Sequence, residues 1–191
     1  MNEKILLGVA WPYANSPIHL GQLAGAYIPP DIFARYHRLR GNDVLMVSGS
    51  DTHGTPITVS AEQMGIGPLE VVERYHGSFL ESFAGLGISF DLFTHTHTRN
   101  HVDVTTDFFL RLLEKGFIYK EVMQQLWCEN DARFLPDRYV EGTCPICGFE
   151  GARGDQCDNC GNQLDALDLV EPRCKLCGQR PFPRETEHFF L

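Results

Sequence analysis

The sequence predicts an α/β protein that consists of a parallel-sheet domain followed by a small module held together by metal. Two short apolar runs, residues 5–9 and 44–48, flank a helical stretch at 23–40, which is the pattern of a βαβ unit with a right-handed crossover. Farther along, six of the seven cysteines fall in Cys-x-x-Cys pairs. We therefore assign residues 1–116 to the sheet domain and residues 117–191 to the metal-stapled module.

The composition limits the classes of protein to which the chain can belong. A chain of 191 residues with 43% hydrophobic residues can bury a core, and its net charge of −9 argues against a generally basic, nucleic-acid-binding surface, although a local contact is compatible with it. The start of the chain lacks the basic segment of a signal peptide, and no apolar run is long enough for a membrane span. Paired cysteines without an export signal favour metal over disulfides, so we expect a cytoplasmic protein.

The loop that follows the first strand is the first candidate site. Parallel strands present their following loops at the carboxyl edge of the sheet, which is where α/β proteins bind ligands. Gly21 has no Cβ, so a ring or a phosphate can approach the backbone closely. His19 and Gln22 are three residues apart at the start of a helix and can direct donors to one place. This loop therefore predicts an anion-binding crevice.

The same loop carries a family resemblance. It resembles the signature of class I aminoacyl-tRNA synthetases, in the form found in methionyl-tRNA synthetases, over the residues Pro12, Tyr13, Ala14, Asn15, Ser16, Pro17, Ile18, His19, Leu20, Gly21 and Gln22. The last four usually read His-Ile/Leu-Gly-His in that family, so Gln22 stands in place of the second His. The resemblance implies the first half of a Rossmann-like nucleotide-binding domain, ATP bound by His19, Gly21 and Gln22, and catalysis by His19 and Gln22.

A second candidate site lies where the second strand ends. Asp51 follows that strand, so it should lie beside the first loop, and its carboxylate can pair with an ammonium group. Residues 51–56 resemble the Asp-x-His-Gly-Thr-Pro segment of methionyl-tRNA synthetases, which implies that Asp51 binds the α-amino group of methionine. By the same resemblance Ala10, Trp11 and Tyr13 line the methionine pocket. The alternatives are a turn role for Asp51 and a core role for Trp11.

Helices and one more strand are expected between the two candidate sites and the cysteines. Pro29 and Pro30 predict a break in the first helix, with its second part starting at Asp31. Short helices are predicted over 57–64 and from Pro68, the second with one apolar face, and residues 94–98 read as a strand edge. A helix over 100–115 should end at Gly116 and turn four apolar side chains inward: Phe108, Phe109, Leu112 and Leu113.

The first two cysteine pairs predict a structural zinc site. Cys144-x₂-Cys147 and Cys157-x₂-Cys160 each end in a glycine, and two such turns can direct four thiolates to one centre. Four sulfurs in a tetrahedron select Zn²⁺ and leave no open position, so this zinc should hold the module together rather than catalyse.

A third pair, Cys174-x₂-Cys177, has only Cys128 left as a partner. Asp131 occupies the position where the second cysteine of a Cys128 pair would stand. We expect a weaker second zinc site with Asp131 or water as fourth ligand; the alternative is a metal-free, degenerate knuckle. Residues 134–145 also resemble the connective insertion of methionyl-tRNA synthetases, which splits the nucleotide fold and carries one or two zinc knuckles.

The resemblance implies a methionine–tRNA ligase, which uses ATP with Mg²⁺ to form methionyl-adenylate and then acylates tRNA(Met). It covers nearly the whole chain but about the first third of a family member, and no Lys-Met-Ser-Lys-Ser-like loop occurs. We therefore expect the chain to need the rest of a longer gene product or a second chain. The alternatives are another class I synthetase or a non-catalytic zinc-ribbon protein that binds nucleotide or nucleic acid. Against the latter, residues 144–177 hold more acids than bases.

Overall fold

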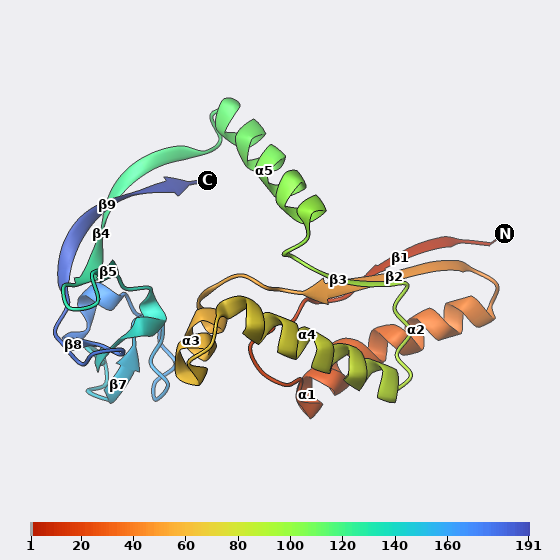
Figure 1. Cartoon of the computed structure of the whole chain (residues 1–191), viewed down its shortest axis with the longest axis horizontal. Helices are drawn as coiled ribbons and strands as arrows, with labels where there is room; N and C mark the ends of the chain where they lie inside the picture. Colours follow the sequence, from red (N-terminus) through yellow and green to blue (C-terminus); the bar gives the residue numbers. More distant parts are fainter. Residues whose placement is uncertain (1) are drawn as a thin grey trace. The chain divides into compact units, whose positions relative to one another are not determined.

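The structure, a computed structural model, describes residues 2–191 and divides the chain into two compact units, Met1–Asp107 and Phe108–Leu191 (Figure 1). The division falls within helix α5 (Arg99–Glu114), earlier than the boundary after residue 116 that the sequence suggests. No helix in the described part of the chain is both long and apolar enough to cross a membrane.

A three-stranded parallel sheet forms the first unit. It consists of β1 (Lys4–Gly8), β2 (Asp43–Ser50) and β3 (Leu92–His95), with β2 in the middle. The two strands predicted from the apolar runs are confirmed. The predicted strand edge over 94–98 is only partly right, because β3 ends at His95 and residues 96–98 form a turn that leads into α5.

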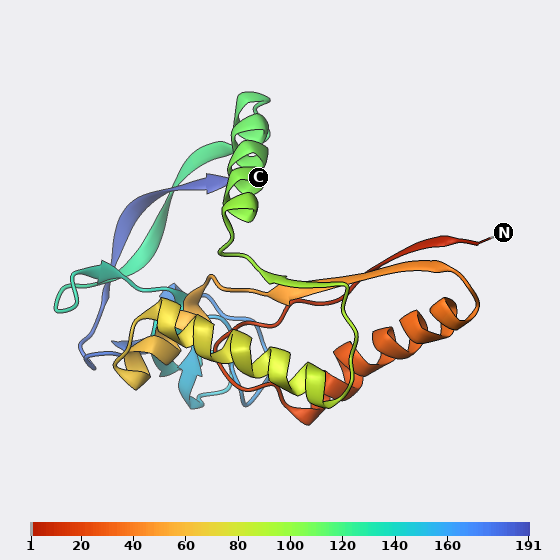
Figure 2. The same ribbon diagram turned by 45° about the vertical axis from the view of Figure 1, so that its right-hand side comes forward.

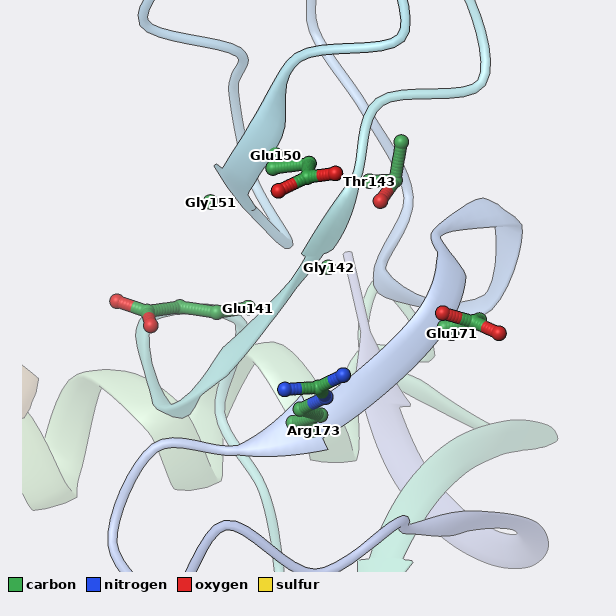
Figure 3. A pocket seen from close by; sticks show the side chains of 7 residues that line it. All are labelled: Glu141, Gly142, Thr143, Glu150, Gly151, Glu171 and Arg173. Carbon is green, nitrogen blue, oxygen red and sulfur yellow. The ribbon is translucent and has the colours of Figure 1, made fainter.

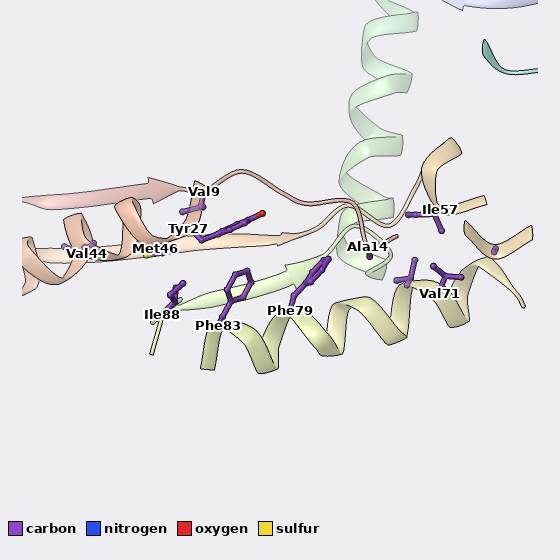
Figure 4. Close-up of a cluster of buried hydrophobic side chains, with 13 residues drawn as sticks. Val9, Ala14, Tyr27, Val44, Met46, Ile57, Val71, Phe79, Phe83 and Ile88 are labelled. Atoms are coloured by element: carbon purple, nitrogen blue, oxygen red, sulfur yellow. The ribbon is translucent and has the colours of Figure 1, made fainter. Parts of the chain in front are cut away.

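Two helices cover one face of this sheet. Figures 1 and 2 show α2 (Ile28–Leu39) and α4 (Pro68–Gly85) on the same side of it, and α3 (Thr55–Met64) precedes α4. Met46 of β2 is fully buried between sheet and helices, together with Tyr27 and Phe79 (Figure 4). The apolar stripe of α4 predicted from its spacing is thus the side that packs on the sheet.

The opposite face of the sheet stays open in the described residues. Side chains alternate along each strand, so Leu6, Leu45 and Leu92 point away from the helices and are 71%, 51% and 55% exposed. The apolar runs at 5–9 and 44–48 predict two buried strands, and this prediction is wrong for Leu6 and Leu45. An apolar run is typical of a strand covered on both faces, and here the helices of residues 2–107 cover one.

The segment after the first loop changes its helical winding. Leu20–Gln22 form a single α-helical turn (α1), Leu23–Tyr27 a π-helical turn (η1), and α2 begins at Ile28. The chain stays helical from Leu20 to Leu39, so the predicted break is only a change from π-helical to α-helical winding, and this change lies at Ile28, before Asp31. Pro29 and Pro30 occupy the first turn of α2, where a missing N–H removes no helical hydrogen bond.

Helix α5 runs through the division between the units. It has no buried residue, and Phe108, Phe109 and Leu113 are 64%, 37% and 38% exposed. The prediction that its phenylalanines and leucines face inward is therefore wrong. The spacing indicates the apolar stripe correctly, but burial also needs a neighbour, and little of the described chain packs on this stripe.

The second unit contains two small antiparallel sheets. One has the strand order β5-β4-β9 and the other β7-β6-β8. Their bounds are β4 (Tyr119–Cys128), β5 (Arg133–Phe134), β6 (Val140–Thr143), β7 (Glu150–Arg153), β8 (Val170–Cys174) and β9 (Phe182–Phe190), with 3₁₀ turns η2 (Asp137–Tyr139) and η3 (Ala166–Asp168). Four cysteines are among its buried side chains, so part of its small core consists of sulfur.

Candidate functional site

The loops that follow β1 and β2 lie side by side beyond the ends of the strands. The Asp51 amide donates to the Pro12 carbonyl at 2.8 Å, and the Ala14 amide donates to the Asp51 carbonyl at 3.0 Å. Tyr13 and Asp51 thereby form an isolated parallel bridge that extends the sheet. The prediction that these two loops are neighbours is confirmed.

One of the two carboxylate oxygens of Asp51 is hydrogen-bonded within its own loop. One carboxylate oxygen, Oδ1, accepts a hydrogen bond from the His53 amide at 3.2 Å, which is the turn contact expected of an Asp at such a position. The residue is of intermediate burial, and within residues 2–191 its other carboxylate oxygen makes no hydrogen bond. This second oxygen is available to a ligand.

Two aromatic rings border the same strand ends. Trp11 is 40% exposed and Tyr13 47% exposed, so Trp11 is not a buried core residue. The Trp11 ring lies directly over Gly49: a Cβ on Gly49 would come within 2.6 Å of Trp11 Cζ3 and 2.7 Å of the Thr94 carbonyl oxygen. Gly49 is thus required for the placement of Trp11, which the sequence did not indicate because the contact is tertiary. Ala10, the last predicted pocket residue, accepts from the Ser48 hydroxyl through its carbonyl at 3.2 Å.

His19 and Gln22 cap the helical turn between them. The Gln22 amide donates to His19 Nδ1 at 3.3 Å, and the His19 amide donates to Gln22 Oε1 at 3.1 Å, which is a reciprocal capping box. Because a backbone N–H can only donate, Nδ1 of His19 is an acceptor and its ring proton is on Nε2. Gly21 lies under this ring, where a Cβ would come within 3.2 Å of His19 Cε1. The structure therefore leaves Nε2 of His19 as the ring nitrogen that can donate to a ligand.

The first cysteine cluster brings together all four predicted ligands: Cys144, Cys147, Cys157 and Cys160. Their sulfurs lie within 4.8 Å of one another. Each pair is a tight turn closed by a glycine with a positive φ, 74° at Gly148 and 71° at Gly161, whose amides donate to the carbonyls of Cys144 and Cys157. These residues could hold a zinc ion, and the all-sulfur donor set fits that metal.

Two asparagines donate to this cluster, and the sequence did not point to them. Asn162 Nδ2 lies 3.2 Å from Cys160 Sγ, and Asn159 Nδ2 lies 3.6 Å from Cys147 Sγ. The Asn162 hydrogen bond lowers the pKa of the Cys160 thiol to about 6, and the Asn159 hydrogen bond lowers that of Cys147. The signal in the sequence is their position around Cys160: Asn159 directly precedes this cysteine and Asn162 follows it by two residues.

The second cluster unites Cys128, Asp131, Cys174 and Cys177, the residues predicted for the weaker site. Asp131 Oδ2 accepts from Cys128 Sγ at 3.1 Å and from Cys174 Sγ at 3.0 Å, while the Cys128 and Cys177 sulfurs are 3.4 Å apart. The turn after Asp131 has Ala132 at φ 48°, in the position that Gly148 fills in the first cluster. Three thiols and one carboxylate could hold a metal ion here.

The electrostatics of the second cluster differ from those of the first. Burial raises the pKa of the Cys128 thiol. Burial and the hydrogen bond to Asp131 together raise the pKa of the Cys174 thiol to about 12. Hydrogen bonds from Cys177, Cys174 and Cys128 lower the pKa of Asp131 to about 2. Without metal, this cluster is a carboxylate that accepts from protonated thiols, so metal binding there must displace protons.

A cavity of about 310 Å³ lies on the β6–β7–β8 sheet (Figure 3). Three carboxylates and one guanidinium line it, from Glu141, Glu150, Glu171 and Arg173. Glu141 is paired with Lys175 at 2.5 Å. None of the predicted substrate-binding or metal-binding residues lines this cavity, although Glu141, Gly142 and Thr143 belong to the stretch 134–145 that carries the family resemblance.

Comparison with known proteins supplies the context. The profile of the family described as tRNA synthetases class I (M) matches residues 5–191. Methionine--tRNA ligase of Thermomicrobium roseum is 68% identical over all 191 residues, and that of Chloroflexus aurantiacus is 55% identical; the chain covers 33% and 32% of these proteins. The chain therefore spans about a third of the length of the relatives it matches.

Solved structures share the fold. Mycobacterium tuberculosis methionyl-tRNA synthetase in complex with methionyl-adenylate aligns with a TM-score of 0.67 at 22% identity, over 98% of this chain and 32% of that one. The Agrobacterium radiobacter K84 agnB2 LeuRS-tRNA-LeuAMS ternary complex aligns with a TM-score of 0.68 at 21% identity, over 100% of this chain and 20% of that one. At these identities the likeness shows the fold and does not separate the two amino acids.

Proposed function

The chain belongs to the family of class I tRNA synthetases (M), and on that premise we propose that it forms the methionine-activating part of a methionine–tRNA ligase. Identity of 55–68% over the whole chain to ligases named for methionine supports the choice of amino acid. The observation that carries the site is the Tyr13–Asp51 bridge, which joins the two signature loops at one edge of the sheet.

The proposed reaction joins methionine to AMP. A carboxylate oxygen of methionine attacks the α-phosphorus of ATP, the bond to the bridging oxygen breaks, and pyrophosphate leaves with that electron pair. The adenylate then transfers its methionyl group to tRNA(Met). The attacking carboxylate is already ionised at neutral pH, so the enzyme must align the reactants and neutralise phosphate charge rather than remove a proton.

The amino-acid side of this site centres on Asp51. Its free carboxylate oxygen would accept from the methionine ammonium group, a charge-assisted hydrogen bond at the end of β2. Trp11 and Tyr13 expose aromatic surface beside it, and a thioether packs well on such surface. Ala10, which precedes Trp11 in the chain, adds a small and exposed side chain.

The ATP side centres on the turn that opens α1. His19 Nε2–H would donate to a phosphate oxygen, since Nδ1 is occupied by the Gln22 amide. The Gln22 side chain keeps its amide nitrogen for the same purpose, because the cap uses only Oε1. Gly21 leaves room for the nucleotide, which would arrive with Mg²⁺.

Zinc is proposed at both cysteine clusters. The four-cysteine cluster offers a closed S₄ site with no position for substrate, so its ion would stabilise the second unit. The Cys128 cluster offers three thiolates and the Asp131 carboxylate, a harder set that should hold zinc less tightly.

We also infer that the active enzyme contains a further region that covers the open face of the first sheet. Parallel sheets are normally covered on both faces, and Leu6, Leu45 and Leu92 leave one apolar face exposed here. The relatives are about three times as long as this chain, which gives such a region ample length. This further region would belong to the same gene product or to a second chain. We also propose that the enzyme is cytoplasmic.

Methionine-dependent exchange of pyrophosphate into ATP tests the function. The enzyme containing this chain and the remaining region should exchange with methionine and not with leucine. Asp51→Asn should lower kcat/KM for methionine about 10- to 100-fold, because the ammonium group then faces a neutral amide in place of a carboxylate. Asp43→Asn, at the opposite end of β2, is the matched control and should change little. Exchange driven by leucine, or an unaffected Asp51→Asn enzyme, would refute the proposal.

A further inference from the structure

His76 of α4 takes no part in the site described above, yet it reaches the tip of β2. We propose that His76 is a positioning residue that holds Ser50 and thereby sets the Asp51 carboxylate for the substrate ammonium group. This inference rests on the proposed function, because it assigns to Asp51 the role of amine ligand.

The contact between α4 and the strand tip is a single hydrogen bond. His76 Nδ1 lies 2.8 Å from Ser50 Oγ, and Ser50 is completely buried. The imidazole is fixed on two sides: it stacks on Phe93 with centroids 5.6 Å apart and meets His95 edge-on at 5.2 Å. His95 is the residue of β3 that pairs with Ser50 in the sheet. These two ring contacts hold the imidazole where its Nδ1 meets the serine hydroxyl.

The other side of the strand tip is tied to the turn after β3. The Thr52 amide donates to Thr96 Oγ1 at 2.9 Å, and the two threonine hydroxyls are 2.8 Å apart. The Thr96 amide donates to the Ser50 carbonyl at 3.1 Å. Ser50 and Thr52 are thus both buried and both bonded, on either side of Asp51.

This arrangement decides where the Asp51 carboxylate goes. Successive side chains of an extended segment point to opposite sides, so inward-held Ser50 and Thr52 direct Asp51 outward, beside Tyr13. Of these hydrogen bonds at residues 50–52, the one between Ser50 and His76 connects the end of β2 to a helix. Without it, Ser50 Oγ loses its partner and the tip is held only by its neighbours in the sheet.

Kinetics of methionine-dependent pyrophosphate exchange, measured on the complete enzyme, test this role. His76→Leu should raise KM for methionine roughly three- to tenfold, the worth of one neutral hydrogen bond, and leave KM for ATP nearly unchanged. His76→Asn, whose amide can stand where Nδ1 stood, should restore KM for methionine. Adding Ser50→Ala to His76→Leu should cause no further increase, because both changes remove the same bond.

The outcomes separate the two proposals. A parent enzyme that shows no methionine-dependent exchange would overturn the proposed function. If the parent is active and His76→Leu leaves both KM values unchanged, or raises both equally, the positioning role is wrong. Should His76→Leu fail to fold, Ser50→Ala alone tests the same bond and must raise KM for methionine while KM for ATP stays constant.

Discussion

The two cysteine clusters are built on the same kind of turn but differ in ligands, in glycines and in span. The first draws four sulfurs from residues 144–160, with a glycine after each pair. The second has Asp131 for one cysteine and Ala132 for one glycine, and it joins Cys128 to Cys177, 49 residues away. The comparison teaches that the positive φ after the second ligand survives the loss of one thiol and one glycine, although the Ala132 amide donates to the Glu129 carbonyl and not to that of Cys128. The first cluster links residues that are close in the sequence, whereas the second links β4 to the end of β8.

The largest expected effect is the loss of the all-sulfur site. Cys157→Ser should remove one zinc per chain and lower the melting temperature strongly, since apparent binding free energies at structural zinc sites are about 10–16 kcal/mol in small peptides. Cys128→Ser should also remove one zinc but lower the melting temperature less. Metal analysis and thermal unfolding measure both. If the parent chain holds one zinc and the Cys128→Ser variant still holds it, the second cluster is metal-free.

The next effect concerns the carboxylate in the second cluster. Asp131→Cys would give that cluster four sulfurs, and zinc release to an added chelator should slow toward the rate of the first cluster. Asp131→Ala should release zinc fastest, because the fourth protein ligand is lost. Release is followed with a zinc-sensitive dye. If Asp131→Ala and the parent release zinc at the same rate, Asp131 is not a ligand.

Thiol reactivity of the metal-free chain should also separate the clusters. With a pKa of about 6, Cys160 is a thiolate at neutral pH, whereas Cys174, with a pKa of about 12, stays protonated. Iodoacetamide should therefore modify Cys160 first, at a rate that falls as the pH drops below about 6. Asn162→Ala should raise that pKa and slow the reaction at neutral pH. Peptide mass spectrometry reads both results; first modification at Cys174 would contradict them.

The smallest effect is expected at the turn residues. Ala132 has φ 48°, a conformation that costs a non-glycine residue roughly 1–2 kcal/mol, so Ala132→Gly should raise the free energy of unfolding by up to about 1 kcal/mol. Gly148→Ala, at φ 74°, is the converse change and should lower it by a similar amount. Urea unfolding of the zinc-loaded chain measures both. A destabilised Ala132→Gly chain would mean that this turn is not strained.

How far the sequence predicts these features depends on the range of the interactions. The cysteine turns follow from local spacing, and Asp131 is identifiable because it occupies a cysteine position. The meeting of Tyr13 and Asp51 follows from the rule that parallel strands end at one edge. An alanine gives no signal of a positive φ, so the conformation of Ala132 was not expected.

Burial and tertiary contacts were beyond what the sequence could supply. Leu6 and the phenylalanines of α5 have the right periodicity, but no local pattern says whether another element will cover them. The contacts of Trp11 with Gly49 and of His76 with Ser50 depend on how a loop and a helix pack on the sheet. The site was therefore predictable as a set of loops, and the residues that fix their side chains were not.

The pairing of β4 with β9 has a consequence for how such a module can evolve. Tyr119, where β4 begins, lies opposite Phe190, where β9 ends, so the two outer ends of this strand pair are about one strand spacing, roughly 5 Å, apart. A domain that carried this strand pair as an insertion would need only a narrow gap in its own chain to accommodate it. Knuckles could be added, lost or exchanged between the two strands without changing the distance that the host must bridge.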